Sequence, residues 1–204
     1  MKFIGVYDYT VVLTYMSLIS GLIGIRLAYA GHIMWAMLCL GISGICDMFD
    51  GVVARTKKNR TQDQKNFGIQ LDSMCDVVCF GVVPAVILFF SGVNSTLGVA
   101  FLAFYVLCAV IRLAFFNVLE TKRQQTEGGC TKSYRGLPVT NAAIILPACF
   151  ILGWFLPDVA MNVIYHVFPV VVGLLFITDF TVPKLDVTKL FRKPAEKKSK
   201  QKEQ

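Results

Sequence analysis

Charged residues are scarce in this sequence. Asp, Glu, Lys and Arg make up 16% of its 204 residues, whereas apolar residues make up 55% and the mean hydropathy is +0.62. Because about a quarter of the residues of a soluble globular domain are charged, this composition argues against a water-soluble fold. If six segments of about 20 residues cross a bilayer, the rest suffices for loops and tails but leaves no room for a separate extramembrane domain.

The sequence also lacks a cysteine framework. Its seven cysteines are odd in number, and all but Cys130 fall in apolar stretches, which indicates buried thiols and argues against disulfides or a zinc site. The first ten residues, MKFIGVYDYT, include Asp8 and contain no A-x-A-like cleavage site. We therefore expect the first apolar run to be a retained helix and not a signal peptide.

Six apolar segments predict an all-α integral membrane protein with six transmembrane helices. The predicted spans are Val11–Tyr29, His32–Val53, Leu71–Phe90, Thr96–Leu119, Val139–Phe155 and Ala160–Phe180. Three connections between them, residues 31, 91–94 and 156–159, contain no Lys or Arg, while residues 55–66 contain five and residues 121–137 contain four. This alternation predicts that both termini and the two basic connections are cytoplasmic.

The C-terminal residues differ in composition from the rest. We expect residues 1–182 to form one six-helix membrane domain and residues 183–204 to form a basic, disordered tail. Eight of the 20 Lys and Arg residues lie between Lys184 and Lys202. A basic run after an apolar segment is typical of an anionic lipid surface rather than of nucleic acid, although a solvated tail is equally compatible with the pattern.

Four aspartates accompany the second and third predicted spans: Asp47, Asp50, Asp72 and Asp76. An Asp at the centre of a membrane helix costs about 2.5 to 3.5 kcal/mol, so these residues should lie near the cytoplasmic ends and face a polar cavity. Their spacings of three and four residues place each pair on one helix face. Since a basic connection joins the two helices, their acidic ends should meet at the same depth.

Four converging carboxylates repel one another unless cations neutralise them. Oxygen-only ligation suits Mg²⁺ or Mn²⁺, and no Cys/His cluster accompanies the acids, so zinc is a poor fit. A buried ion pair would explain a single Asp but not four at this spacing. Between the carboxylates, Gly51, Ala54 and Gly68 leave a bare helix surface on which a flat base or a diphosphate could lie.

These residues form a recognisable pattern. It reads Asp47-x2-Asp50-Gly51-x2-Ala54-Arg55, followed by Gly68-x3-Asp72-x3-Asp76. The pattern resembles, at every position, the signature of the CDP-alcohol phosphotransferase family of integral membrane enzymes. Two features depart from it: the linker Thr56–Phe67 is about one helical turn longer, and Ser17 stands between Thr14 and Gly21 where the family often has Asn.

Two further stretches resemble the bacterial phosphatidylserine synthases within that family. The stretch from Arg112 to Asn117 reads RLAFFN and differs from theirs at its fourth position, where they have Arg. The stretch from Tyr134 to Pro138 contains a similar Gly-Leu-Pro before the fifth span. Arg112 could instead be a snorkelling or ion-paired residue, and Arg135 an ordinary basic loop residue.

The resemblance implies an enzyme that transfers a phosphatidyl group from CDP-diacylglycerol to L-serine, releasing CMP and forming phosphatidylserine. It implies two ions, Mg²⁺ or Mn²⁺, held by the four aspartates, with Asp76 also accepting the hydroxyl proton. The residues expected to bind the nucleotide lipid are Gly51, Ala54, Arg55, Gly68, Thr14 and Ser17. The residues expected to bind serine are Arg112, Asn117 and Arg135.

We further expect a multi-pass enzyme of the cell membrane with a cytoplasmic active site, forming a homodimer in contact with membrane lipids and binding no nucleic acid. The nearest alternative is the same chemistry with another acceptor, such as glycerol phosphate or inositol phosphate. A cation transporter would place its carboxylates near the midplane in broken helices with inverted repeats, which the sequence does not display. A non-catalytic scaffold gives no reason for four aligned aspartates.

Overall fold

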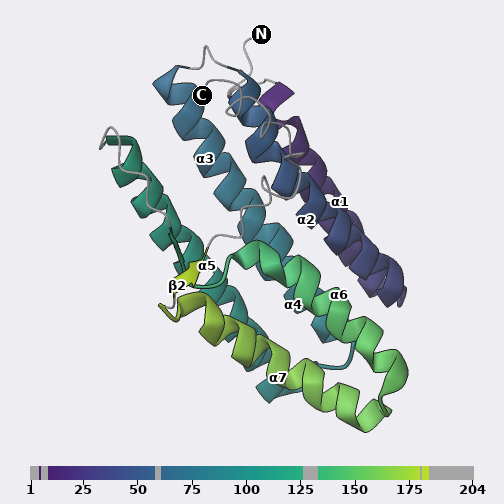
Figure 1. Ribbon diagram of the computed structural model, residues 1–204. Coiled ribbons are helices and arrows are strands. Elements are labelled where there is room, and N and C mark those ends of the chain that lie inside the picture. The colour runs from purple at the N-terminus through teal and green to yellow at the C-terminus, as the bar shows by residue number, and fades with distance from the viewer. Residues whose placement is uncertain (1–4, 6–8, 58–60, 126–132, 180, 184–204) are drawn as a thin grey trace, which may run out of the picture.

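The computed structural model describes residues 5, 9–57, 61–125, 133–179 and 181–183, most of them helical. The helices are α1 (Val12–Tyr29), α2 (Ile33–Thr56), α3 (Gln62–Asp76), α4 (Val83–Phe90), α5 (Thr96–Gln125), α6 (Ala142–Leu152) and α7 (Asp158–Ile177). Short 3-10 turns lie beside α1 and α6: η1 (Tyr9–Val11), η3 (Val139–Asn141) and η4 (Gly153–Phe155). A π-helical turn, η2 (Val77–Val82), joins α3 and α4 into one rod (Figure 1).

Five helical rods in the described part of the chain are long and apolar enough to cross a membrane. They comprise Tyr9–Tyr29, Ile33–Ala54, Gln62–Phe90, Thr96–Leu119 and Asp158–Ile177. The prediction of a helical, multi-pass integral membrane protein is therefore confirmed. The predicted fifth span, Val139–Phe155, is a shorter apolar helix. The number of six spans and the cytoplasmic side of the termini stay predictions.

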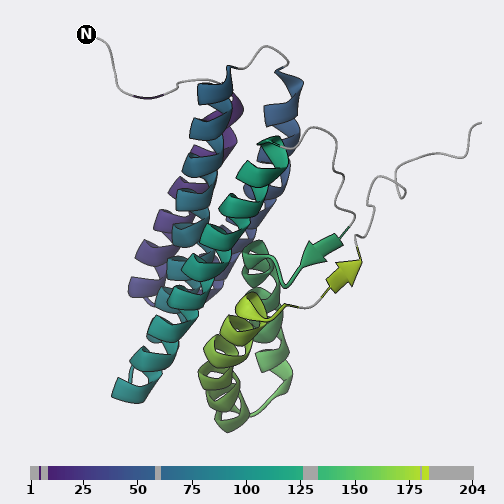
Figure 2. The same cartoon turned by 90° about the vertical axis from the view of Figure 1, so that its left-hand side faces the viewer.

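The rods pack in two main pairs, α1 with α2 and α5 with α7 (Figures 1 and 2). The rod of η2 and α4 lies between these pairs, and α6 packs against α2. The largest fully buried apolar side chains come from α2, the central rod, α5, α6 and α7: Leu40, Phe80, Ile87, Leu88, Tyr105, Leu146 and Phe176. Many other large apolar side chains are exposed on the outer faces of the long helices, as a lipid-facing surface requires.

Small polar side chains line the contact between α1 and α2. Ser17 Oγ and Ser43 Oγ lie 2.7 Å apart, and each lies 3.1 Å from the other residue's backbone carbonyl oxygen. Ser20 Oγ donates to Cys39 O at 2.9 Å. Such short side chains let two helices approach closely and bond across their interface. The turn between them is only residues 30–32, with Gly31 at a φ of +81° that favours glycine.

Glycines of the first two spans face three different neighbours. Gly24 does face α2, since an added Cβ would lie 3.3 Å from a side-chain carbon of that helix. Gly21 instead faces η2 and α4, and Gly44 faces α6, where an added Cβ would lie 2.7 Å from Ala143 Cβ. Gly41 has nothing within 4 Å of such a Cβ. Of these four glycines, Gly24 is therefore the one that lets α1 and α2 approach each other.

The third helix begins well before the predicted start at Leu71. It starts at Gln62 behind a capping box, in which Thr61 Oγ1 accepts from Gln64 N at 3.3 Å and Thr61 N donates to Gln64 Oε1 at 3.2 Å. The polar residues of this segment gave it the hydropathy of a loop. Of the predicted linker Thr56–Phe67, residues 62–67 are therefore helical, and α3 extends beyond its apolar part.

A π-turn interrupts the central rod directly after Asp76. Its backbone hydrogen bonds reach five residues back, and Pro84 follows at the start of α4. Because proline has no N–H, the carbonyl of Phe80 cannot accept the i+4 hydrogen bond of a regular α-helix. The Tyr105 hydroxyl of α5 donates to this carbonyl oxygen at 2.6 Å. A neighbouring helix thus satisfies a backbone group that water cannot reach.

Two short strands connect the segment before α6 with the segment after α7. β1 (Ser133–Arg135) and β2 (Thr181–Pro183) pair in antiparallel fashion (Figure 2). Gly136 follows β1 with a φ of +71°, and a Cβ there would lie 2.9 Å from Thr178 O, so a larger residue would not fit. Apart from Pro183, the predicted tail 183–204 lies outside the described residues.

The cysteines in the described part of the chain are free thiols, as predicted. Those that are buried are Cys75, Cys79 and Cys108, and those that are half-buried are Cys39, Cys46 and Cys149. Cys130 lies outside the described residues.

Candidate active site

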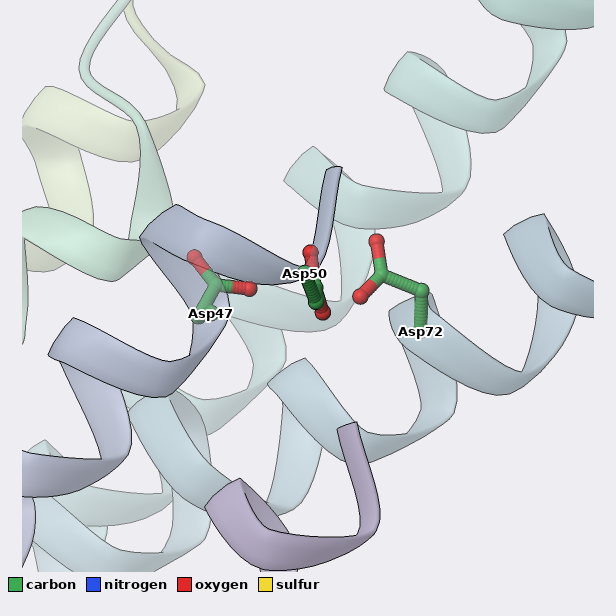
Figure 3. Close-up of side chains that lie close together, drawn as sticks. All are labelled: Asp47, Asp50 and Asp72. Atoms are coloured by element: carbon green, nitrogen blue, oxygen red, sulfur yellow. The ribbon is translucent and has the colours of Figure 1, made fainter. Parts of the chain in front are cut away.

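The C-terminal halves of α2 and α3 bring the predicted aspartates together. Asp47, Asp50 and Asp72 each place a carboxylate oxygen within 4.8 Å of the other two (Figure 3). The carboxyl group of Asp76, one turn beyond Asp72, contacts that of Asp47, and Asp72 contacts Asp50. The four carboxyl groups therefore form one cluster, the acidic cluster, between two facing helices.

The acidic cluster fits a divalent cation. Asp72 Oδ1 is buried and has no hydrogen-bond partner, and Asp76 is only 9% exposed. Two unit charges 4.8 Å apart repel by about 3 kcal/mol at an effective dielectric constant of about 20, so buried carboxylates at this spacing need a counter-charge. Oxygen-only donors are the ligands that Mg²⁺ and Mn²⁺ prefer.

Helix α1 contributes one side chain to the acidic cluster. Thr14 Oγ1 donates to Asp50 Oδ2 at 3.2 Å, which links α1 to the carboxylates. Ser17, one turn further along, instead bonds with Ser43 and lies 3.6 Å from Cys79 Sγ. Thr14 therefore belongs to the cluster, whereas the hydroxyl of Ser17 serves the contact between α1, α2 and η2.

The small residues expected to accommodate the nucleotide lie beside the acidic cluster. Gly51 is exposed next to Asp50, and a Cβ there would meet nothing within 4 Å. Ala54 and Gly68 are half-buried on α2 and α3. At Gly51, the surface of α2 next to the carboxylates is therefore not covered by a neighbouring side chain. Arg55 belongs to the last turn of α2, and its side chain lies outside the described part of the structure.

A cavity of about 130 Å³ opens beside the acidic cluster. Its lining comes from α3, α5 and the segment around η3: Asp76, Arg112, Leu113, Phe116, Pro138, Val139 and Thr140. Arg112 is 6% exposed and donates from Nε to Leu137 O at 3.3 Å. Its Cζ lies 5.6 Å from the centre of the Phe116 ring, within cation–π range. A buried arginine and a buried aspartate thus line the same small cavity.

Of the other two predicted acceptor residues, the structure describes the side chain of Asn117. Asn117 Oδ1 accepts a hydrogen bond from Ser73 Oγ at 2.7 Å, which ties α5 to α3 beside Asp72. Asp179, just after α7, is close enough to Arg112 to interact with it electrostatically. Arg135 lies in β1, but its side chain is outside the described part of the structure.

Sequence reasoning missed three side chains near the site. Phe116 stacks on Arg112, Ser73 holds Asn117, and Thr140 lines the cavity at the start of the fifth predicted span. Ser73 directly follows Asp72, and its position beside the acidic stripe was a signal that could have identified it. Phe116 lay within the RLAFFN stretch, but an aromatic residue in a membrane helix gives no signal of its own.

Comparison with known proteins finds a matching family model and several similar enzymes. The family model described as CDP-alcohol phosphatidyltransferase matches residues 9–177, which include the acidic cluster and the seven α-helices of the described residues. An archaetidylserine synthase of Methanothermobacter thermautotrophicus is 30% identical over 82% of this chain and 66% of its own length. Two enzymes named CDP-diacylglycerol–serine O-phosphatidyltransferase are also similar. That of Methanocaldococcus jannaschii is 32% identical over 90% of this chain and 76% of its own length. That of Helicobacter pylori is 31% identical over 79% and 66%.

The match covers just under two thirds of the length of the first and third of these relatives. The family model, by contrast, spans most of this chain, from the first turn of the first rod to the end of α7. The chain therefore belongs to the CDP-alcohol phosphatidyltransferase family, whose members are generally dependent on divalent metal ions.

Proposed function

We propose that this protein transfers a phosphatidyl group from CDP-diacylglycerol to the hydroxyl of L-serine, releasing CMP and forming phosphatidylserine. The observation that carries the proposal is the cavity lined by both Asp76 and Arg112, which connects the acidic cluster to a buried positive charge. The names of the three relatives described above support serine as the acceptor, since each contains serine or archaetidylserine.

The donor site in this proposal is the acidic cluster. Its four carboxylates hold two divalent ions, Mg²⁺ or Mn²⁺, which supply the positive charge that a bound diphosphate requires. The cytidine and the diphosphate lie along the uncovered surface of α2 and α3, and the acyl chains lie in the bilayer. The residues that bind this nucleotide lipid are Gly51, Ala54, Arg55, Gly68 and Thr14, while Ser17, whose hydroxyl bonds with Ser43, supports the helix contact beside them.

Asp76 accepts the proton in this proposal. The serine oxygen forms a bond to the phosphorus atom that carries the diacylglycerol, while the bond from that phosphorus to the CMP oxygen breaks and CMP leaves with the electron pair. Asp76 is suited to take the hydroxyl proton because, of the four aspartates, it lines the cavity together with Arg112. Its burial keeps water, a competing nucleophile, away from the reacting atoms.

Arg112 binds the serine carboxylate in this proposal. A guanidinium forms charge-assisted hydrogen bonds with a carboxylate, and burial strengthens them. The bond from Arg112 Nε to Leu137 O and the contact with Phe116 hold the side chain in place. Asn117, oriented by Ser73, and Arg135 complete the acceptor site.

The charge pattern of the sequence supports a cytoplasmic active site in a membrane enzyme. Residues 1–182 form the catalytic domain of a cell-membrane enzyme, and residues 183–204 form its basic tail. The Lys and Arg residues of the connections support a cytoplasmic active site, because α2 and α3 carry the acidic cluster near the basic connection that joins them. We further propose that the enzyme is a homodimer.

The acceptor can be tested with purified protein, CDP-diacylglycerol and a panel of labelled alcohols. Serine should release CMP, whereas glycerol phosphate and inositol phosphate should not. Replacing Arg112→Ala should raise the KM for serine about tenfold to hundredfold and leave that for CDP-diacylglycerol nearly unchanged, since one charge-assisted hydrogen bond contributes about 1.5 to 3 kcal/mol. Arg26→Ala, on the exposed last turn of α1, is the matched control.

The proton acceptor is tested by a second pair of variants. Asp76→Asn should abolish turnover yet weaken CDP-diacylglycerol binding less than Asp47→Asn does. If another alcohol turns over in place of serine, or if Arg112→Ala keeps the wild-type KM for serine, the serine assignment is refuted while membership of the family stands.

A further inference from the structure

The hydrogen bond from Tyr105 to the central rod, which consists of α3, η2 and α4, lies close to the active site. Tyr105 is completely buried, and its hydroxyl donates at 2.6 Å to the carbonyl oxygen of Phe80, which cannot accept an i+4 hydrogen bond from Pro84. Phe80 lies four residues after Asp76, which is about 6 Å along a helix. The bond is therefore made one turn from the proposed proton acceptor.

The backbone next to Asp76 is the part of the rod with the weakest internal constraint. The π-turn η2 begins at Val77, so the regular α-helical ladder ends at Asp76. A π-turn is a rare interruption of an α-helix, and a strained backbone conformation persists only where neighbouring structure holds it. The Tyr105 hydroxyl is the side-chain donor that reaches this turn from α5.

Tyr105 is itself held firmly by α7. Its ring packs against Phe168 and Phe176, with ring centres at 6.1 and 5.5 Å. Gly173 lets α7 approach α5 at this point, since a Cβ there would lie 3.4 Å from Tyr105 Cα. The hydroxyl therefore has little freedom to follow the rod if the rod slides.

Tyr105 also shares a helix face with Arg112. The two residues are seven positions, or two turns, apart on α5, about 10 Å along the helix axis, and both are buried on the side that faces the rod. This bond, together with that from Ser73 Oγ to Asn117 Oδ1, therefore fixes α5, which carries Arg112, against the rod, which carries Asp76. These are the two charged residues that line the cavity.

We propose that Tyr105 is a positioning residue that sets the axial register of Arg112 against Asp76 and thereby the alignment of the acceptor with the donor. The expected effect on turnover with serine rests on the proposed function, whereas the expected effect on the register of α5 against the rod does not. Of the donor residues named above, Asp76 lies within about one turn of this bond, whereas the others lie on α1, α2 and earlier turns of α3. Binding of the nucleotide lipid should therefore depend on the bond much less than turnover does.

The central test compares Tyr105→Phe with a variant that satisfies the carbonyl in another way. Tyr105→Phe should lower kcat with serine about tenfold or more, since a displacement of about 1 Å can cost about a hundredfold in rate, and should leave the KM for CDP-diacylglycerol unchanged. It should also lower thermal stability. Adding Pro84→Ala restores an N–H that can bond to Phe80 O, so the double variant should regain stability but not kcat.

Two controls complete the experiment. Tyr165→Phe removes a hydroxyl from a half-buried tyrosine of α7 and should keep wild-type kcat. Spin labels at Gln70 of α3 and Val118 of α5, both exposed, report the register directly, and their distance distribution should broaden or shift in Tyr105→Phe and in the double variant. Because this distance does not depend on the acceptor, it tests the register even if serine fails as substrate.

Two results would overturn the inference. If the double variant regains both stability and kcat, the hydroxyl serves only to satisfy a carbonyl. If the spin-label distances of Tyr105→Phe equal those of the wild type, the bond does not set the register.

Discussion

Replacing Asp72 with Asn should change stability in opposite directions with and without divalent metal. Asp72 Oδ1 is buried without a hydrogen-bond partner, and its carboxylate lies within 4.8 Å of those of Asp47 and Asp50. At that separation each pair of charges repels by about 3 kcal/mol at an effective dielectric constant of about 20. Asn has nearly the same shape but no charge, so Asp72→Asn should stabilise the metal-free protein by a few kcal/mol at most.

With divalent metal bound, the wild type should instead be more stable than Asp72→Asn. A ligand that binds only the folded state at about a hundred times its Kd stabilises that state by about 2.7 kcal/mol. The wild type should gain this stabilisation when Mg²⁺ or Mn²⁺ is added. Asp72→Asn should gain much less, because an amide oxygen is a weaker ligand than a carboxylate, and its release of CMP should be abolished.

The measurement is thermal unfolding in detergent, first with EDTA and then with increasing Mg²⁺ or Mn²⁺. A mildly alkaline buffer keeps the carboxylates from relieving their repulsion by binding protons. Asp63→Asn removes an exposed charge from the first turn of the same helix and should show no metal-dependent change relative to the wild type. If metal leaves the wild-type midpoint unchanged, or if Asp72→Asn is the less stable protein in EDTA, the two-metal reading of the acidic cluster is refuted.

Three further predictions concern packing, capping and topology. Gly44→Ala should lower stability by about 1 to 3 kcal/mol because the new methyl group meets α6 at 2.7 Å, while Gly41→Ala should not; equal unfolding midpoints would contradict this. Thr61→Ala should weaken the first turn of α3 by about 1 kcal/mol, seen as faster amide exchange there and not in α5. In a cysteine-free background, Asn94→Cys should react with an impermeant thiol reagent in intact cells and Asp63→Cys should not; labelling only at position 63 would reverse the orientation.

The long apolar runs and the acidic motif could be predicted because each depends on local sequence. Hydropathy identifies a membrane helix without knowledge of its neighbours, and the spacing of Asp47, Asp50, Asp72 and Asp76 determines their helix faces. The start of α3 could not be predicted from hydropathy, because this helix continues into a polar segment. The capping residues Thr61 and Gln64 were the signal for it, and they are too common to decide a helix start alone.

Contacts between distant segments were beyond sequence reasoning. Nothing local to Tyr105 indicates that its hydroxyl replaces the N–H that Pro84 lacks, since the two residues lie on different helices. The pairing of β1 with β2 joins segments separated by two helices. Ser17 was expected at the nucleotide because of its place in a motif, whereas the structure uses its hydroxyl against Ser43.

The three-residue turn between α1 and α2 has a consequence for how the chain enters a membrane during synthesis. Helix α2 carries two aspartates, and if it entered by itself their insertion would cost about 5 to 7 kcal/mol if both reached the bilayer centre. The turn at Gly31 allows α1 and α2 to enter as a preformed hairpin, with Thr14 already bonded to Asp50 before α3 leaves the ribosome. Lengthening this turn with a flexible insert should therefore impair biogenesis more than it impairs the finished enzyme, because the helices would then reach the insertion machinery one at a time.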